Sequence, residues 1–290
     1  MTAKIRVAAA PISWGVCEVP GWGRVLEAPA VLGEMAELGV TATEFGPPGY
    51  LPREPAVLKK LLGSHRLELV GGFLAVPLHV NPDAAVAEAE DSAALFAACG
   101  GGTLVLAAAT GLHGYDERPT LTDAEWSTLV STARKIRDTA AKHGLQTVLH
   151  PHVGTHVETE AEVERFLADS DLQLCLDTGH LLIGGTDPVA LAQRHPRRIG
   201  HLHLKDVRGE LAEAVRAGQL PYAEAVGKGL YVPLGEGDVD IEAMVRSVAE
   251  AGYDGWYVLE QDTALSDDSP VDRPGQDVAT SLSYLRTITG

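Results

Sequence analysis

The chain has 290 residues, of which 45% are hydrophobic and 22% are charged, as in ordinary folded globular proteins. Forty acidic residues against 23 Lys and Arg give a formal net charge of −17, which disfavours a nucleic-acid-binding function because such a chain repels a phosphate backbone. Cys17, Cys99 and Cys175 are widely spaced and odd in number, so we expect no disulfide framework and a cytoplasmic location.

The segment from Ser92 to Tyr115 contains no Asp, Glu, Lys or Arg. Three adjacent glycines, at positions 100–102, would interrupt a membrane-spanning helix in this segment. We therefore interpret it as a helix end, a glycine turn and a buried strand, and we expect no membrane partner.

Short, continuously apolar runs recur along the chain in the pattern of parallel strands covered by helices. The eight runs are Ile5–Ala10, Thr41–Phe45, Leu67–Gly71, Thr103–Ala107, Gln146–His150, Gln173–Asp177, Ile199–Leu204 and Trp256–Glu260. Segments of helical period separate them, and two of these segments begin with capping boxes, at Thr122 and at Thr159. Eight such units predict an α/β fold, a (β/α)8 TIM barrel that forms a single domain over residues 1–290.

The long interval before the last run predicts an insertion at about residues 207–238, between strand seven and the last helix. A doubly wound open sheet is the alternative fold. It is disfavoured because Pro11–Gly15, which follows the first run, lacks the glycine-rich phosphate-binding motif. A homo-oligomer is compatible with this sequence.

Histidines and carboxylates follow four consecutive predicted strands, at the end of the barrel where active sites form. The candidate metal ligands are His150, Asp177, His203 and Glu260. Imidazole and carboxylate ligands suit a divalent cation, and manganese or cobalt is preferred here over zinc, iron or magnesium. His152 is an alternative to His150. Strand alternation favours His203 over His201, which would lie one layer deeper.

Several segments resemble the xylose-isomerase-like barrel superfamily of sugar phosphate isomerases and epimerases. They include HPHVGT at 150–155, LDTGH at 176–180, HLHLKD at 201–206 and GWYVLEQD at 255–262. The superfamily typically binds its metal with Glu, Asp, His and Glu from strands five to eight, and His150 replaces the first of these. The His-rich segment is most similar to the inosose dehydratases, which act on 2-keto-myo-inositol. Those enzymes carry a Lys at the position of Gly72, so the particular polyol is left open.

The resemblance implies that Glu260 is both a metal ligand and the base that removes a proton next to a ketone. The other expected catalytic residues are His180, His152 and Lys205, with His152 or His156 as the acid that protonates a departing hydroxyl. The expected substrate-binding residues are Glu44, Trp14, His156 and Arg208.

These residues suit proton abstraction from a ketone to form an enediolate. Loss of a neighbouring hydroxyl from the enediolate gives dehydration, and return of the proton gives isomerisation or epimerisation. The sequence predicts a metal-dependent dehydratase of a cyclic keto-polyol, with a keto-sugar or inosose isomerase or epimerase as the alternative. A non-catalytic barrel and an abasic-site endonuclease are the other function classes, and both are disfavoured.

Overall fold

The computed structural model describes residues 5–17, 19 and 21–290, in which eight parallel strands close into a barrel. The order of hydrogen-bonded neighbours is β1-β10-β7-β6-β5-β4-β3-β2, and β1 closes the barrel by pairing with both β10 and β2. The strands are β1 (Arg6–Ala9), β2 (Ala42–Glu44), β3 (Glu68–Val76), β4 (Thr103–Ala108), β5 (Gln146–Leu149), β6 (Gln173–Asp177), β7 (Ile199–Leu204) and β10 (Trp256–Leu259). The predicted (β/α)8 barrel is confirmed.

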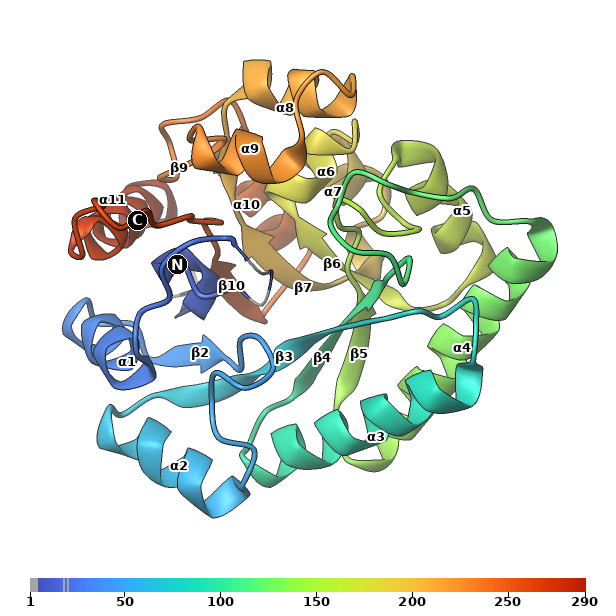
Figure 1. Ribbon diagram of the computed structural model, residues 1–290, viewed down its shortest axis with the longest axis horizontal. Helices are drawn as coiled ribbons and strands as arrows, with labels where there is room; N and C mark the ends of the chain where they lie inside the picture. Colours follow the sequence, from blue (N-terminus) through green and yellow to red (C-terminus); the bar gives the residue numbers. More distant parts are fainter. Residues whose placement is uncertain (1–4, 18, 20) are drawn as a thin grey trace.

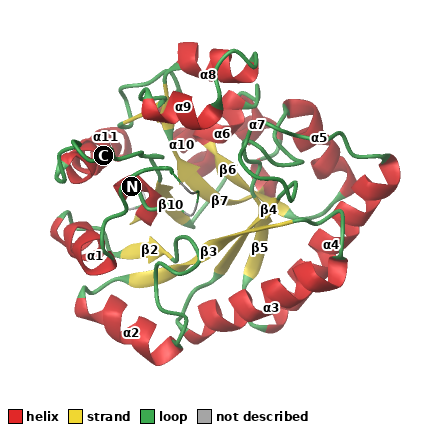
Figure 2. Ribbon diagram, in the orientation of Figure 1, coloured by secondary structure: helices red, strands yellow, loops and turns green. Residues whose placement is uncertain are grey.

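Helices surround the strands on the outside of the barrel (Figures 1 and 2). They are α1 (Ala28–Glu37), α2 (Pro55–Ser64), α3 (Pro82–Ala98), α4 (Asp123–Lys142), α5 (Glu160–Asp169), α6 (Thr178–Ile183), α7 (Pro188–Arg194), α10 (Ile241–Glu250) and α11 (Arg273–Thr289). The predicted capping boxes are present at the starts of α4 and α5. In each box a Thr side chain accepts from the third helical N–H, and the Glu at that position bonds back to the Thr.

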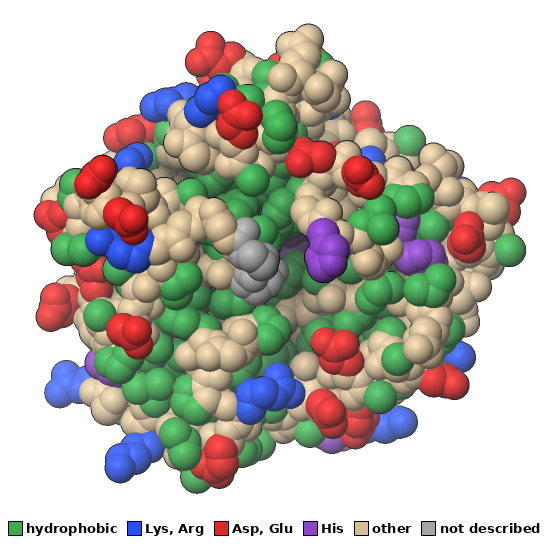
Figure 3. All heavy atoms as spheres, viewed as in Figure 1, with side chains coloured by type: hydrophobic (Ala, Val, Ile, Leu, Met, Phe, Trp, Pro, Cys, Tyr) green, Lys and Arg blue, Asp and Glu red, His purple; other side chains and the backbone are tan. Residues whose placement is uncertain are grey.

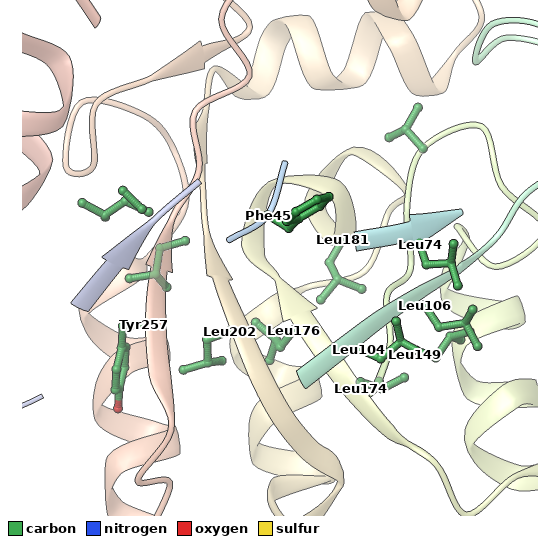
Figure 4. Close-up of a cluster of buried hydrophobic side chains, with 14 of the residues drawn as sticks. Phe45, Leu74, Leu104, Leu106, Leu149, Leu174, Leu176, Leu181, Leu202 and Tyr257 are labelled. Carbon is green, nitrogen blue, oxygen red and sulfur yellow. The ribbon is translucent and has the colours of Figure 1, made fainter. Parts of the chain in front are cut away.

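Buried leucines form the layer between the barrel and its helices, as Figure 4 shows for Leu104, Leu106 and Leu176. Val105 and Cys175 are neighbours of these leucines on the same strands and point the opposite way. They belong to a separate buried cluster. This separation follows from the alternation of side chains along a strand. The same alternation turns His203 to the side opposite Leu202.

Strand β3 differs from the expected Leu67–Gly71, because it continues to Val76, while the other seven barrel strands agree with expectation within one residue at each end. Gly71 does not end the strand, and instead allows β3 to approach β4: a Cβ atom there would lie 1.8 Å from the carbonyl oxygen of Thr103. Gly72 faces Phe96 and not the open end of the barrel.

Four short elements lie between β7 and α10, in the segment expected to be an insertion. They are β8 (Asp206–Val207), α8 (Gly209–Arg216), α9 (Tyr222–Gly227) and β9 (Tyr231–Val232), and β8 pairs with β9 in an antiparallel sheet. The Asp206 carboxylate accepts hydrogen bonds from backbone N–H groups, including those of Gly235 and Gly237, and so holds the returning chain. Figure 1 shows α8 and α9 next to each other at one end of the molecule.

No helix among the described residues is both long and apolar enough to cross a membrane. Among the described residues, Cys99 and Cys175 form no disulfide.

Candidate metal centre and its cavity

Four side chains from neighbouring strands converge at the carboxyl end of the barrel. Asp177 is the last residue of β6 and pairs in register with His203 of β7. His150 directly follows β5, and Glu260 directly follows β10. The hydrogen-bond register of the parallel strands brings these positions together, although they are far apart in the sequence.

The converging atoms lie at the spacing of ligands around one metal ion. His203 Nδ1 lies 3.1 Å from both His150 Nε2 and Glu260 Oε2, and 3.6 Å from Asp177 Oδ2. His150 Nε2 lies 3.4 Å from Asp177 Oδ2. Ligands at about 2.1 Å from a tetrahedral ion are separated by about 3.4 Å. The four residues form one of the groups whose atoms could hold an ion, with all donor atoms within 4.8 Å of one another.

The two oxygens of Asp177 have different environments. Oδ1 accepts hydrogen bonds from the backbone N–H groups of Gly179 and His180, and in this way caps α6. Oδ2 is completely buried, points toward the two histidines and has no hydrogen-bond partner among the described residues. A buried carboxylate oxygen without a donor is costly, and a cation at this point would satisfy it. The residues present therefore fit a divalent metal.

Glu44, at the end of β2, orients His203 from across the barrel. Its Oε1 lies 2.8 Å from His201 Nε2 and 3.0 Å from His203 Nε2. Burial would raise the pKa of Glu44, but His203 and His201 hold it well below its usual range. With Nε2–H of His203 donated to this carboxylate, Nδ1 is the nitrogen that faces the metal group and would bind an ion once deprotonated.

A cavity of about 310 Å³ lies above this group, and it is lined by His150, His203, Glu260, Glu44 and Lys205 among others. Apolar residues form much of the remaining wall, and hydrophobic side chains gather around the centre of the face shown in Figure 3. Lys205 is the only Lys or Arg among the described residues that line the cavity. Its Nζ lies 3.0 Å from Glu260 Oε2, and it also forms an ion pair with Asp262. Burial would lower the pKa of Lys205, but Asp262, Glu260 and Asp177 raise it well above its usual value.

His152 lines the cavity but lies outside the metal group. Its Nδ1 is 2.7 Å from the carbonyl oxygen of Val153, so Nδ1–H is donated there and Nε2 is left as an acceptor. Burial, with the nearby His150, lowers the pKa of His152 to about 3. A neutral ring in this tautomer has no proton on Nε2 to give, which disfavours the acid role expected from the sequence.

Four other expected site residues do not line the cavity in the described part of the chain. Trp14 is fully buried and donates its indole N–H to Glu34 of α1, so its ring turns away from the cavity. His156 packs against His79 with ring centroids 4.4 Å apart. Within the described residues neither Trp14 nor His156 lines the cavity, and their expected contacts with substrate stay predictions.

Arg208 and His180 are the other two. Arg208 is exposed at the start of α8, with its guanidinium beside Gly229, because the chain leaves the barrel end at this point. His180 lies behind His152, with ring centroids 3.7 Å apart, and its Nε2 is 3.3 Å from Lys205 Nζ. It therefore contacts Lys205 and, among the described residues, does not line the cavity; the expected roles of Arg208 and His180 toward substrate stay predictions.

The sequence analysis missed several residues at this site. Trp22, Phe73, Tyr115 and Asp262 line the cavity. Asp262 follows Glu260 by two residues, a spacing that could have indicated it. No signal in the sequence indicated the aromatic residues, because their elements meet only in the folded barrel.

Residues 32–288 match the xylose isomerase-like TIM barrel family, and the chain belongs to this family. It is 30% identical over 300 aligned residues to the inosose dehydratase of Geobacillus thermodenitrificans (strain NG80-2), covering 99% of this chain and 98% of the relative. It is 35% identical over 269 residues to the rhizopine catabolism protein MocC of Rhizobium meliloti, covering 89% and 81%. The structure of the IolI protein with a bound zinc atom has a TM-score of 0.71 at 14% identity and covers 98% of both chains, a likeness of fold alone.

Proposed function

We propose that this protein is a metal-dependent lyase that removes water from a cyclic keto-polyol such as 2-keto-myo-inositol, through an enediolate. The observation that supports this most is the group of His150, Asp177, His203 and Glu260 beneath the cavity. The similarity to an inosose dehydratase over 99% of the chain supports the reaction class. The preference for manganese or cobalt, a role in inositol catabolism and a cytoplasmic location belong to the same proposal.

The four residues of this group would hold the cation. When bound, a divalent cation supplies a Lewis acid that stabilises negative charge on the oxygen of a ketone substrate.

Glu260 is the base in this proposal. Its side chain reaches the cavity and is 10% exposed, so a substrate carbon can approach it. Burial would raise the pKa of Glu260, but His203 and Lys205 lower it to about 2. It is therefore ionised at neutral pH and can accept the proton next to the ketone.

Lys205 and His152 bind the substrate. The Lys205 ammonium lies beside Glu260 in the cavity wall, and it stabilises the negative charge that develops on the substrate oxygen as Glu260 takes the proton. His152 offers Nε2 as an acceptor for a substrate hydroxyl. Glu44 holds His203 and also lines the cavity.

An isomerase or epimerase of keto-sugars or inososes is the second candidate. The state of His152 favours it, because a neutral ring with an acceptor at Nε2 does not protonate a departing hydroxyl. Without that proton the enediolate would be reprotonated on carbon, and isomerisation or epimerisation would result.

The test is incubation of the manganese-loaded protein with 2-keto-myo-inositol, followed by ultraviolet absorbance and proton NMR, with ketohexoses compared in parallel. We expect an unsaturated, water-loss product from the cyclic ketone and none from the metal-stripped protein. Isomerised or epimerised ketone without loss of water would reject the dehydratase and support the second candidate.

A further inference from the structure

Lys205 is held by three acceptors, which match the three protons of an ammonium group. Its Nζ lies 3.0 Å from Glu260 Oε2 and 3.3 Å from His180 Nε2, and it pairs with Asp262 Oδ1. Lys205 itself is only 2% exposed. The position of its charge is therefore set by these neighbours and not by solvent.

Asp262 is in turn held by Tyr222, whose hydroxyl contacts a second tyrosine of the segment between β7 and α10. The hydroxyl of Tyr222, in α9, donates to Asp262 Oδ2 at 2.7 Å. It also lies 2.9 Å from the hydroxyl of Tyr231, in β9, whose ring centroid is 5.4 Å from Lys205 Nζ. Both tyrosines are buried. A continuous set of polar contacts thus connects α9 with the ammonium group beside Glu260.

We propose that Asp262 and Tyr222 are positioning residues, which hold the Lys205 ammonium against Glu260 so that it meets the negative charge of the substrate. This rests on the role given to Lys205 in the proposed function. A lysine has a flexible four-carbon stem and three rotatable donors, so its charge has a defined place only where its neighbours fix it. The elements between β7 and α10 would then complete the active site and not merely cover the barrel.

A substitution at Tyr222 can distinguish a positioning role from a packing role. Its ring contacts Tyr115, with centroids 4.9 Å apart, and Trp22, at 6.4 Å, while its hydroxyl contacts Asp262. Tyr222→Phe keeps the ring and removes only the hydroxyl. Within the described residues Tyr222 does not line the cavity, so this substitution leaves the walls around the substrate unchanged. Tyr257→Phe is the matched control, because Tyr257 is equally buried and its hydroxyl has no hydrogen-bond partner in the described part of the chain.

The first measurement is steady-state kinetics of the manganese-loaded protein on 2-keto-myo-inositol. We expect Tyr222→Phe to lower kcat by about 10-fold, the effect of losing one hydrogen bond to a charged group, with KM changed by less than about 2-fold. Asp262→Asn should lower kcat further, and Tyr257→Phe should match wild type. An unchanged kcat in Tyr222→Phe overturns the proposal. A fall in kcat that Tyr257→Phe shares also overturns it, since the effect is then general to the core.

The second measurement needs no turnover. Lysine ammonium protons that are buried and hydrogen-bonded exchange slowly with water and give a signal in nitrogen-15 NMR, which Lys205→Arg would assign by its disappearance. In the metal-free protein we expect this signal in wild type and Tyr257→Phe, and its broadening or loss in Tyr222→Phe. A signal that Tyr222→Phe leaves intact overturns the anchoring of Lys205. If wild type shows the signal but does not convert 2-keto-myo-inositol, the proposed function fails. The NMR comparison of wild type with Tyr222→Phe then decides on its own whether Tyr222 anchors Lys205.

Discussion

Glu44 and His203 face each other across the barrel, with Glu44 Oε1 3.0 Å from His203 Nε2. Their strands, β2 and β7, are not neighbours in the order of the barrel. The contact holds the His203 ring with its Nδ1 directed toward Asp177 and Glu260. A residue on the opposite wall thus determines how a candidate ligand presents its lone pair.

Glu44→Gln should weaken divalent-metal affinity by about 10–100-fold, the usual effect of removing a carboxylate that orients a ligating histidine. His201→Asn should have a smaller effect, because His201 shares the Glu44 oxygen but is not in the group with Asp177 and Glu260. Isothermal calorimetry with Mn²⁺ measures both. Equal losses in the two variants would argue that His201 is itself a ligand, as in the other possible group of Glu44, His201 and His203.

Asp177→Asn should weaken metal binding by more than about 100-fold, because it removes a buried anionic oxygen directed at the group. Asp187→Asn is the matched control, since Asp187 caps α7 by accepting from two backbone N–H groups in the same way. Metal content after dialysis against Mn²⁺ and thermal melting of both variants provide the readout. If both variants melt alike and both retain metal, Asp177 serves only as a helix cap.

His152→Ala should raise KM for the polyol by about 10-fold, the cost of one lost hydrogen bond, with a smaller effect on kcat. The competing acid role predicts the reverse: elimination slowed by about 10²–10⁴-fold, while the α-hydrogen of the substrate still exchanges with deuterium. Kinetics and deuterium wash-in, measured on the same protein sample, distinguish the two. A large loss of kcat with intact exchange would restore His152 as the acid.

His156 should make the protein less stable in mild acid. Burial, together with the neighbouring His79, lowers its pKa from 6.5 to about 4 in the folded state. As the pH falls below 6.5, the unfolded chain binds a proton at this histidine and the folded chain does not. The free energy of unfolding that is present above pH 6.5 is therefore lost progressively toward pH 4. His156→Gln should lose less free energy of unfolding between pH 7 and pH 4.5, measured in urea. The exposed His113→Gln is the control, and an identical acid dependence in wild type and His156→Gln would contradict the expectation.

The barrel could be predicted because each of its elements leaves a local pattern. Continuous apolar runs mark strands buried on both faces, and capping boxes such as that at Thr122 mark helix starts. The residues that end each strand can also be read from the local sequence. The group of His150, Asp177, His203 and Glu260 could therefore be predicted before the distances between them were known. The end of β3 was predicted wrongly at Gly71, because a glycine in a strand pattern can mark either the end of the strand or a close approach of two backbones.

The sequence by itself thus determined the barrel and the residues at its carboxyl end, since both depend on periodicity within single segments. Only the tertiary structure decided which side chains meet. It turned Trp14 toward Glu34, placed Trp22 at the cavity, and fixed the tautomer of His152 through the carbonyl of Val153. It also brought Tyr222 to Asp262. The physical reason is that a buried hydrogen bond depends on distance and direction between elements remote in the chain, and no local pattern of hydrophobicity encodes these.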